Sequence, residues 1–334
     1  MATNKYIVPI GILIAVIFII AGGFLVLNPH HPDSPGTWDD ADDNESYFEP
    51  TQNFIPDVKV QEGELKRNAD LRLKTGNRYN YEYKFTIPLN LMMGGGRTDN
   101  NQTDKKDVPD VNMKMSGSMD VVVDRKERYN KSDVFVLTWT SLMKYENLEE
   151  LMMAEKKGNE MTQQEMQQMT MLKEGINTSG ETWISNDGKP VKMVTKRFGM
   201  EITTEGEKAE GSSMMGGFGA NMMIQPWMLA LNENFEWTKN TTVNMSGVKS
   251  TSSERYKVVN VEETDTKAGR RKCYKVEKES LSSIDMSEKS KVAANTKISG
   301  KSVLWIDYNK RILVKAENWM ENLKIGTIEL ANEK

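Results

Sequence analysis

Apolar and polar residues alternate with a period of two along much of the chain. Aromatic or apolar residues occupy the odd positions from Tyr79 to Ile87, and polar residues occupy the even ones. The same alternation runs from Val111 to Val123 and places Met113, Met115 and Met119 at apolar positions. A β-strand shows this pattern when one of its faces is buried and the other is solvated. These stretches therefore predict strands whose methionines belong to the core.

Six more short apolar runs predict further strands, and polar turn signals separate them. They cover Asp133–Trp139, Glu254–Val261, Cys273–Val276, Ser302–Tyr308, Arg311–Glu317 and Leu323–Leu330. Helix formers instead dominate Asn147–Leu172, which predicts one or two helices with a break near Gly158. Met222–Asn232 is a second helical candidate. We therefore expect a mainly β fold with minor α content, built on a curved antiparallel sheet.

The longest apolar run, Tyr6–Leu27, contains no charged residue. As a helix it would span roughly 33 Å at about 1.5 Å per residue, which matches a hydrocarbon core of about 30 Å. A cleaved signal peptide is the alternative interpretation. The run is longer than a typical signal core, and no Ala-x-Ala site follows it. We therefore predict an uncleaved transmembrane signal-anchor helix over residues 6–27.

The flanks of this helix predict its orientation. Lys5 precedes it, whereas residues 28–58 contain eight acidic residues and no Lys or Arg. Because positive charge stays on the cytoplasmic side, residues 1–5 form a cytoplasmic tip and everything after residue 27 lies outside. Five of the ten prolines also fall within residues 28–58, as expected for an extended acidic stalk. Residues 59–334 then form the β-rich extracytoplasmic body.

Two pairs of segments in the body resemble each other. "TWISNDGKPVKMV" at 182–194 resembles "LWIDYNKRILVK" at 304–315, and "VVVDRKERYNKSDVFVL" at 121–137 resembles "VVNVEETDTKAGRRKCYKV" at 258–276. The order is the same in both parts of the body. An internal duplication with halves 71–206 and 236–330 explains this order. Chance similarity between short hairpins explains it equally well.

Most of the body carries a family resemblance. The Tyr-rich opening strand, "GRRKCYKVEKE", "VLWIDYNKRILVKAE" and the terminal "GTIEL" resemble the lipoprotein-carrier type of half-barrel, as in LolA-like and RseB-like domains. The resemblance covers about Leu71–Leu330. It implies a curved antiparallel sheet wrapped round helices, with a hydrophobic cavity for acyl chains. The chain departs from that family in its expected membrane anchor and its methionine-rich insertions.

The residue types needed for catalysis are scarce. The chain has one cysteine, Cys273, and two histidines, His30 and His31, both in the expected stalk. A lone cysteine excludes an internal disulfide framework and a multi-cysteine zinc site, and most catalytic constellations use an imidazole. We therefore expect no enzyme, no cofactor and no metal site. A net charge of −4 with 28% charged residues gives no sign of a nucleic-acid partner.

Methionines gather beside glycines in "LMMGGG" at 91–96 and "SSMMGGFGANMM" at 212–223. A Gly-rich hinge followed by an apolar stretch suits a lid over a cavity, and unbranched methionines adapt to ligands of irregular shape. A surface loop followed by an ordinary core helix is at least as well supported. The ligand-binding candidates are Met92, Met93, Met214, Met215, Phe218, Met222, Met223 and Trp227.

These features together predict a single-pass membrane protein whose extracytoplasmic body binds a lipid, a lipid-modified protein or another apolar ligand near the membrane. The alternative is a structural cell-surface or envelope-assembly component without a small ligand. Methionine-mediated copper binding is less favoured, because no His or Cys accompanies the methionines. The sequence does not identify a protein partner. Candidate glycosylation sites are Asn44, Asn101, Asn130, Asn177, Asn240 and Asn244.

Overall fold

The computed structural model describes residues 57–88, 112–151, 163–197, 199–206, 209, 219–245, 248–285, 295–320 and 322–334. Within these residues thirteen strands form one sheet in which every pair of neighbours is antiparallel. The strands are β1 (Asp57–Glu62), β2 (Arg78–Pro88), β3 (Asn112–Tyr129), β4 (Ser132–Tyr145), β5 (Ile176–Ser185), β6 (Pro190–Arg197), β7 (Met200–Glu205), β8 (Glu236–Met245), β9 (Val248–Thr266), β10 (Gly269–Asp285), β11 (Asn295–Asp307), β12 (Leu313–Met320) and β13 (Leu323–Glu333).

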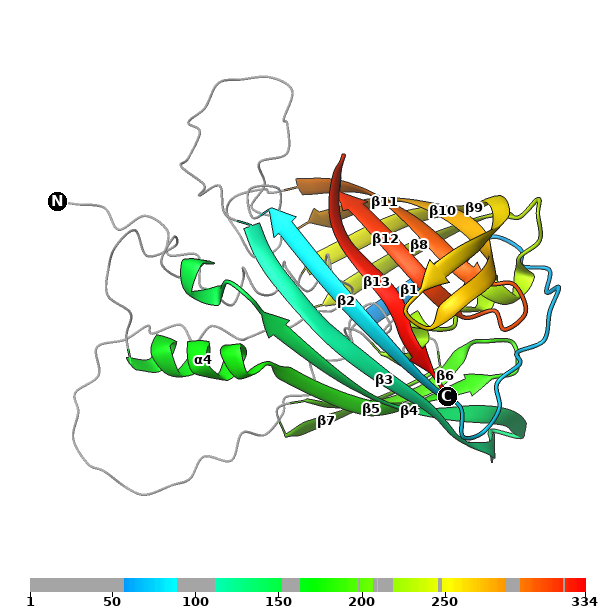
Figure 1. The fold of residues 1–334 in the computed structure, drawn as a ribbon, viewed down its shortest axis with the longest axis horizontal. Helices are drawn as coiled ribbons and strands as arrows, with labels where there is room; N and C mark the ends of the chain where they lie inside the picture. Colours follow the sequence, from blue (N-terminus) through cyan, green and yellow to red (C-terminus); the bar gives the residue numbers. More distant parts are fainter. Residues whose placement is uncertain are drawn as a thin grey trace.

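The sheet joins two runs of consecutive strands through one long-range pair. Its order is β1-β8-β9-β10-β11-β12-β13-β2-β3-β4-β5-β6-β7, so β13 pairs with β2 and β1 with β8. Figure 1 shows the sheet curving, with the cyan and green strands β2–β5 on one side and the yellow to orange strands β8–β11 on another. The predicted mainly β architecture with a curved antiparallel sheet is confirmed.

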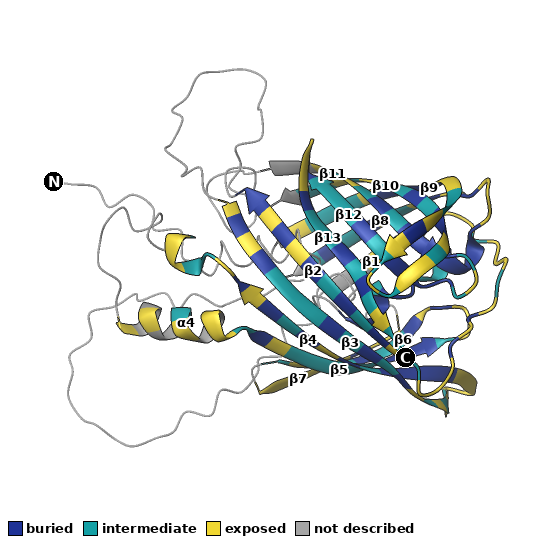
Figure 2. Ribbon diagram, in the orientation of Figure 1, coloured by how far each residue is buried: buried dark blue, intermediate teal, exposed yellow. Residues whose placement is uncertain are grey.

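Alternation along the strands follows the sequence pattern. On β2 the side chains of Tyr79, Tyr81 and Tyr83 are buried, whereas the residues between them are partly or fully exposed. On β3 the predicted core methionines Met113 and Met115 are buried in the same way. Figure 2 shows the resulting bands of buried and exposed residues along β2 and β3. Period-two patterning therefore selects the face of the sheet that forms the core.

The two ends of the sheet differ, because antiparallel neighbours place alternate strand ends together. One end carries the start of β1 at Asp57, the end of β2 at Pro88 and the start of β3 at Asn112. We call it the entry end, because the described chain enters the sheet there. The opposite end carries the tight β3–β4 turn at Asn130 and Lys131, both with positive φ, and we call it the turn end.

A short irregular segment, 219–231, crosses the core on the inner face of the sheet. It contains two 3-10 helices, η2 (Ala220–Met222) and η3 (Pro226–Ala230). Backbone bonds fasten it: the N–H of Leu313 donates to the Met223 carbonyl at 2.9 Å, and that of Asn68 donates to the Leu229 carbonyl at 2.9 Å. The inner faces of the surrounding strands form one core cluster with it.

The expected helix over Met222–Asn232 is replaced by these two short 3-10 helices. Pro226 lacks the N–H that would continue a helix from η2, and it disfavours helical geometry in the residue before it. Gln225 is accordingly extended, with φ −136° and ψ 152°. The helical prediction was therefore wrong in type, although the apolar residues of the segment are buried as a core element would require.

Helices are otherwise few among the described residues. A helical turn covers residues 148–151 within the predicted helical stretch, and α4 spans Gln163–Glu174, two residues past the predicted end at Leu172. The expected break near Gly158 lies outside the described residues. No helix in the described part of the chain has the length and apolar character needed to cross a membrane. The expected anchor at 6–27 and the stalk up to residue 56 lie outside it too.

The start of β12 differs from the prediction. A strand was expected from Arg311, but β12 begins at Leu313. Arg311 has a φ of 58° and belongs to the β11–β12 turn, where its N–H donates to the Asp307 carbonyl at 3.0 Å. A non-glycine residue rarely adopts this left-handed conformation, so periodicity alone does not reveal it. The Arg311 guanidinium lies 4.5 Å from the Tyr274 ring centroid.

The two runs β2–β7 and β8–β13 repeat a local arrangement on their outer faces. The indole N–H of Trp183 on β5 donates to Glu127 on β3 at 2.5 Å, and that of Trp305 on β11 donates to Glu262 on β9 at 2.7 Å. The strand register shifts directly after each tryptophan. Because strand position, hydrogen bond and bulge all agree, these pairs define corresponding positions in the two runs.

Candidate functional site

The inner face of the second run carries a band of polar residues next to the apolar core, on the side of the entry end. Tyr256 on β9 and Val276 on β10 belong to the core cluster. Two residues further toward the entry end on the same strands, Glu254 and Lys278 take their places. Residues two apart on a strand point to the same face. The charged side chains therefore lie on the inner face, next to the core.

Polar residues continue across the neighbouring strands at this level. The register pairs Lys239 with Glu62 and Glu254, Ser252 with Ser282, and Ser302 with Asn318. We call the set the inner polar patch. Its members are Glu62, Lys239, Ser252, Glu254, Lys278, Ser280, Ser282, Ser302 and Asn318. The patch thus spans six adjacent strands, from β1 through β8 to β12.

Both lysines of the inner polar patch are paired. Lys278 Nζ lies 2.5 Å from a Glu254 carboxylate oxygen, and Lys239 Nζ lies 3.1 Å from one of Glu62. The Tyr256 hydroxyl donates to the second oxygen of Glu254 at 2.8 Å. The Glu254 side chain is only 8% exposed, whereas that of Lys278 is 25% exposed. The charges therefore cancel locally, and Lys278 stays partly exposed to solvent.

Hydroxyl groups fill the rest of the inner polar patch. Ser302 Oγ donates to Asn318 Oδ1 at 2.8 Å, and Ser282 Oγ donates to Ser252 Oγ at 3.3 Å. Each of these residues is half-buried. A hydroxyl is one donor and two acceptors, so each keeps capacity for a further hydrogen bond. The patch can therefore bind polar groups without breaking its own contacts.

The pKa of Glu254 reflects this setting. Burial acts to raise the pKa of the carboxyl, but the charge and hydrogen bond of Lys278 and the hydroxyl of Tyr256 outweigh it. The pKa of Glu254 therefore lies below its ordinary value. A carboxyl whose pKa is lower in the folded state stabilises the fold at pH values above its unfolded pKa. That stabilisation is lost as the pH falls through the folded-state pKa.

Glu254→Gln is expected to lower the unfolding free energy at neutral pH by roughly 1.5–3 kcal/mol, the range for a charged hydrogen bond. The difference from wild type should shrink below about pH 4.3, where unfolded-state glutamates protonate. Denaturant unfolding followed by circular dichroism across pH 2–7 measures this. Glu236→Gln, which alters the exposed pair with Arg255, is the control and should have little effect. If the difference in unfolding free energy between Glu254→Gln and wild type stayed constant down to pH 2, the lowered pKa of Glu254 would be contradicted.

At the positions that correspond to these charges, the first run of strands, β2–β7, has apolar and aromatic residues. Glu254 lies eight residues before Glu262, and Met119 lies eight before Glu127. Met119 is fully buried in the core cluster. By the same register, the counterparts of Glu254, Lys278 and Lys239 in the first run are Met119, Trp139 and Tyr81.

Exposed apolar side chains lie on the inner face of the first run at its edge. Thr204 on β7 pairs with Met193 on β6, whose sulfur contacts Asn221 of the inner segment at 4.0 Å. Two and four residues before Thr204, Ile202 and Met200 share its face and are 47% and 55% exposed. Strand β7 ends the sheet. The inner face therefore offers accessible apolar groups on β7 and accessible polar groups on β8–β12.

The predicted ligand-binding residues fall into two groups. Met223 and Trp227 are buried in the core cluster, and Trp227 is 2% exposed. Met222 is half-buried and packs against that cluster. The other five, Met92, Met93, Met214, Met215 and Phe218, lie outside the described residues. The structure thus brings Met222, Met223 and Trp227 together in the inner segment, where the two buried side chains support the fold.

The predicted glycosylation sites are spread over the sheet. Asn130 is exposed in the β3–β4 turn, and Asn177 and Asn240 are exposed on β5 and β8. Asn244 is half-buried near the end of β8. Asn44 and Asn101 lie outside the described residues. The three exposed asparagines are accessible to a modifying enzyme in the folded chain.

Cys273 is a structural thiol in this fold. Its side chain is buried beside Val303 and Val314 on the outer face. Burial raises the pKa of the Cys273 thiol to about 12, so the thiol stays protonated and unreactive at neutral pH. Within the described residues no group of His, Cys, Asp and Glu side chains has the arrangement of a metal site.

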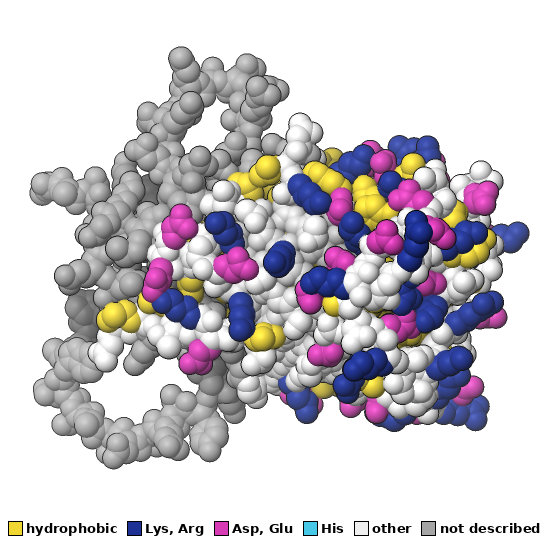
Figure 3. Space-filling view, viewed as in Figure 1, with side chains coloured by type: hydrophobic (Ala, Val, Ile, Leu, Met, Phe, Trp, Pro, Cys, Tyr) yellow, Lys and Arg dark blue, Asp and Glu magenta, His cyan; other side chains and the backbone are white. Residues whose placement is uncertain are grey.

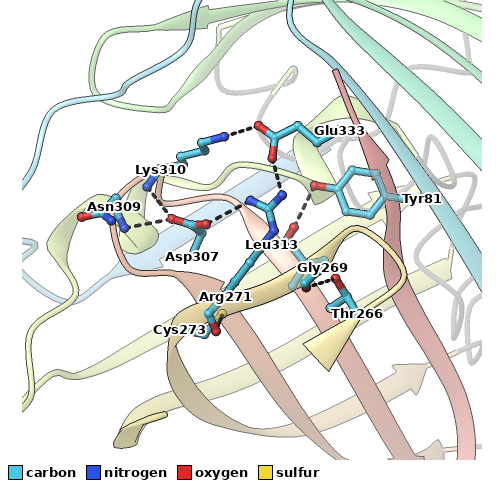
Figure 4. A network of polar contacts seen from close by, with 10 residues as sticks. All are labelled: Tyr81, Thr266, Gly269, Arg271, Cys273, Asp307, Asn309, Lys310, Leu313 and Glu333. Atoms are coloured by element: carbon cyan, nitrogen blue, oxygen red, sulfur yellow. Dashed lines mark hydrogen bonds and ion pairs between the residues drawn. The ribbon is translucent and has the colours of Figure 1, made fainter. Parts of the chain in front are cut away.

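A second polar network lies at the turn end and holds the end of the C-terminal strand, β13, against its surroundings (Figure 4). Arg271 on β10 points between Asp307 and Glu333, with N···O distances of 3.3 and 2.5 Å. Lys310 also pairs with Glu333. Asp307 Oδ1 accepts the backbone N–H of Lys310 at 2.8 Å. Each of these four charged side chains has an oppositely charged partner. The pairs link β10, the β11–β12 turn and β13.

The inner polar patch was missed by sequence reasoning. Its signal is local: on β10 the inner positions change from apolar Val276 to Lys278, Ser280 and Ser282. Such a run resembles an exposed strand end when it is read alone. On the face shown in Figure 3, Lys and Arg are interspersed with Asp and Glu, so no region of one sign marks a site on that surface.

Comparisons with known proteins give little further information. No protein-family model and no curated protein sequence matches the chain. Two solved structures are similar over 80% of it: a Bacteroides fragilis protein assigned as exported with a YmcC-like fold (12% identity, 99% of that chain, TM-score 0.33) and a Parabacteroides distasonis protein assigned as a lipoprotein (11% identity, 100% of that chain, TM-score 0.37). Similarity this low assigns neither a family nor a function, and the LolA-like and RseB-like family is not identified.

Proposed function

We propose that the protein is a membrane-anchored, extracytoplasmic and non-catalytic binding protein that holds an amphipathic, lipid-like ligand against the inner face of its sheet. One observation carries this proposal: the inner face presents accessible apolar side chains on β7 and an accessible inner polar patch on β8–β12. A ligand with an apolar chain and a polar head needs both kinds of surface.

The apolar side chains on β7 would contribute part of the binding free energy. Met200 and Ile202 are about half exposed, and fully burying a side chain of this kind contributes about 1.5–3 kcal/mol. Micromolar binding requires about 8 kcal/mol. Met200 and Ile202 would therefore supply only part of this free energy, and further apolar contacts and hydrogen bonds to the inner polar patch would have to supply the rest and offset the costs of association.

The connectivity supports binding near a membrane. The described chain enters the sheet at Asp57, within the last two residues of the acidic segment 28–58 that we expect to be a stalk. The β2–β3 connection leaves the sheet at Pro88 and returns at Asn112, at the same entry end. Met92 and Met93 belong to this connection. The connection that carries these methionines therefore starts and ends at the end where the anchor is expected to join.

The proposal includes an internal duplication of halves 71–206 and 236–330. The matching tryptophan–glutamate bonds and the matching bulges support it. A duplicated sheet with one apolar and one polar inner face gives a simple origin for an amphipathic binding surface. The second half would have acquired charged and hydroxyl side chains at positions that pack the core in the first.

A structural envelope component without a small ligand is the second candidate function. It is favoured by the inner segment 219–231, whose apolar side chains fill the core between the strands. Under this alternative the accessible part of the inner face would contact only solvent, and the outer face would mediate assembly.

Photo-crosslinking in the native membrane distinguishes the two candidates. Full-length protein with p-benzoylphenylalanine at Ile202 or Ser282, both on the inner face, should form lipid adducts on irradiation, detected by mass spectrometry. The matched controls carry the same group at Glu201 or Leu281, which neighbour those residues but point to the outer face. Absence of adducts at Ile202 and Ser282 would refute the proposal, and so would equal labelling at all four positions.

A further inference from the structure

The inner polar patch also restricts the kind of head group it can bind. We infer that the polar part of the ligand is neutral and rich in hydroxyl groups, as in a glycosyl head group, rather than a phosphate. This inference rests on the proposed lipid-binding function and makes it more specific. It follows from the pairing of the charges and the spacing of the hydroxyl groups.

The charges of the patch leave no cation available for a phosphate. Lys278 and Lys239 are each within 3.1 Å of a glutamate oxygen, so the four side chains sum to zero. A phosphate that formed an ion pair with Lys278 would leave the buried Glu254 without its cationic partner. Removing one partner from a buried ion pair is strongly destabilising. An anionic head group is therefore disfavoured, whereas a neutral one leaves both pairs intact.

The hydroxyl groups match a polyol. Ser252, Ser280, Ser282 and Ser302 lie on three adjacent strands, and adjacent strands are about 4.8 Å apart. Each hydroxyl can donate and accept, as can each hydroxyl of a sugar. The Asn318 amide adds further donor and acceptor capacity. Neighbouring sugar hydroxyls can therefore bond to neighbouring strands at the same time.

Native mass spectrometry of the full-length protein in detergent tests the inference. The probes are monogalactosyl diacylglycerol, phosphatidylglycerol and phosphatidylethanolamine with identical acyl chains, and methyl β-galactoside without a chain. We expect the galactolipid to bind about tenfold more tightly than either phospholipid, the effect of one to two net hydrogen bonds. The free galactoside should bind far more weakly, because the apolar contacts are missing.

Variants assign the effect to the patch. Ser252→Ala/Ser282→Ala should reduce the galactolipid preference about tenfold while leaving phospholipid binding unchanged. The matched control, Ser253→Ala/Ser299→Ala, removes two outward-facing hydroxyls from β9 and β11 and should change nothing. Ser280→Ala, whose hydroxyl makes a long 3.4 Å contact with the Gly300 carbonyl, provides a single-site version that is expected to fold normally.

The outcomes separate the two proposals. If no lipid binds, the proposed function fails and the inference fails with it. If phosphatidylglycerol binds as well as the galactolipid, or better, the function stands and the inference is overturned. Tight binding of the free galactoside would overturn the lipid-binding function and leave a sugar site. An equal loss of affinity for all three lipids in the serine variants would show that these hydroxyls do not discriminate between head groups, and would overturn the inference.

Discussion

Trp227→Ala is expected to lower the free energy of unfolding by about 3–5 kcal/mol, the range for truncating a buried tryptophan. Trp227 is 2% exposed, and its ring centroid lies 4.7 Å from that of Tyr256 and 6.3 Å from that of Phe235. Alanine would leave a cavity where the inner segment crosses the core. Denaturant unfolding followed by far-UV circular dichroism measures the loss.

The control for this change is Trp319→Ala. Trp319 is half-buried at the outer cluster beside Trp305 and Val314, so its removal exposes surface rather than opening a cavity in the core. We expect a much smaller loss there. If both variants lost the same free energy, the inner segment would not support the fold in the way its burial indicates. If Trp227→Ala was instead stable and lost ligand binding, the residue would belong to an open lid.

Arg271→Ala should cost about 3 kcal/mol, near the lower end of the range for removing one partner from a buried ion pair. Its side chain is 15% exposed, and those of Asp307 and Glu333 are each 10% exposed. Removal of the guanidinium leaves two carboxylates facing Lys310 alone. Thermal unfolding should show a lower midpoint for the variant than for the wild type.

Arg255→Ala is the matched control, because Arg255 pairs with Glu236 at 2.7 Å on the open surface. Exposed pairs contribute about 0–1 kcal/mol. Comparable losses for Arg271→Ala and Arg255→Ala would show that the turn-end network is screened by solvent and does not stabilise the C-terminal strand.

The strands were readable from the sequence because their pattern is local. Tyr79 to Ile87 alternates within nine residues, and the structure buries the predicted face. The conformations of Gln225 and Arg311 were not readable, because the restriction imposed by Pro226 and a left-handed turn override the apolar pattern around them. Apolar runs therefore predict well which residues are buried, and less well whether those residues form a helix, a strand or a turn.

The inner polar patch could not be predicted because it depends on register between distant strands. Glu62 reaches Lys239 only through the β1–β8 pair, and Ser302 meets Asn318 only through β11–β12. Each polar residue taken alone resembles an ordinary surface position. The lid hypothesis did not point to the patch, because it was based on where methionines gather in the sequence. The patch instead consists of Glu, Lys, Ser and Asn side chains.

The pairing of β13 with β2 affects how the chain can be made. Within each run every strand pairs with the next one along the chain, so these pairs can form as the chain emerges. The edge of β2, however, stays open until the last strand of the body has been synthesised. An open edge is a template for pairing with another chain. During synthesis the β2 edge is therefore open to pairing with other chains until β13 emerges and covers it.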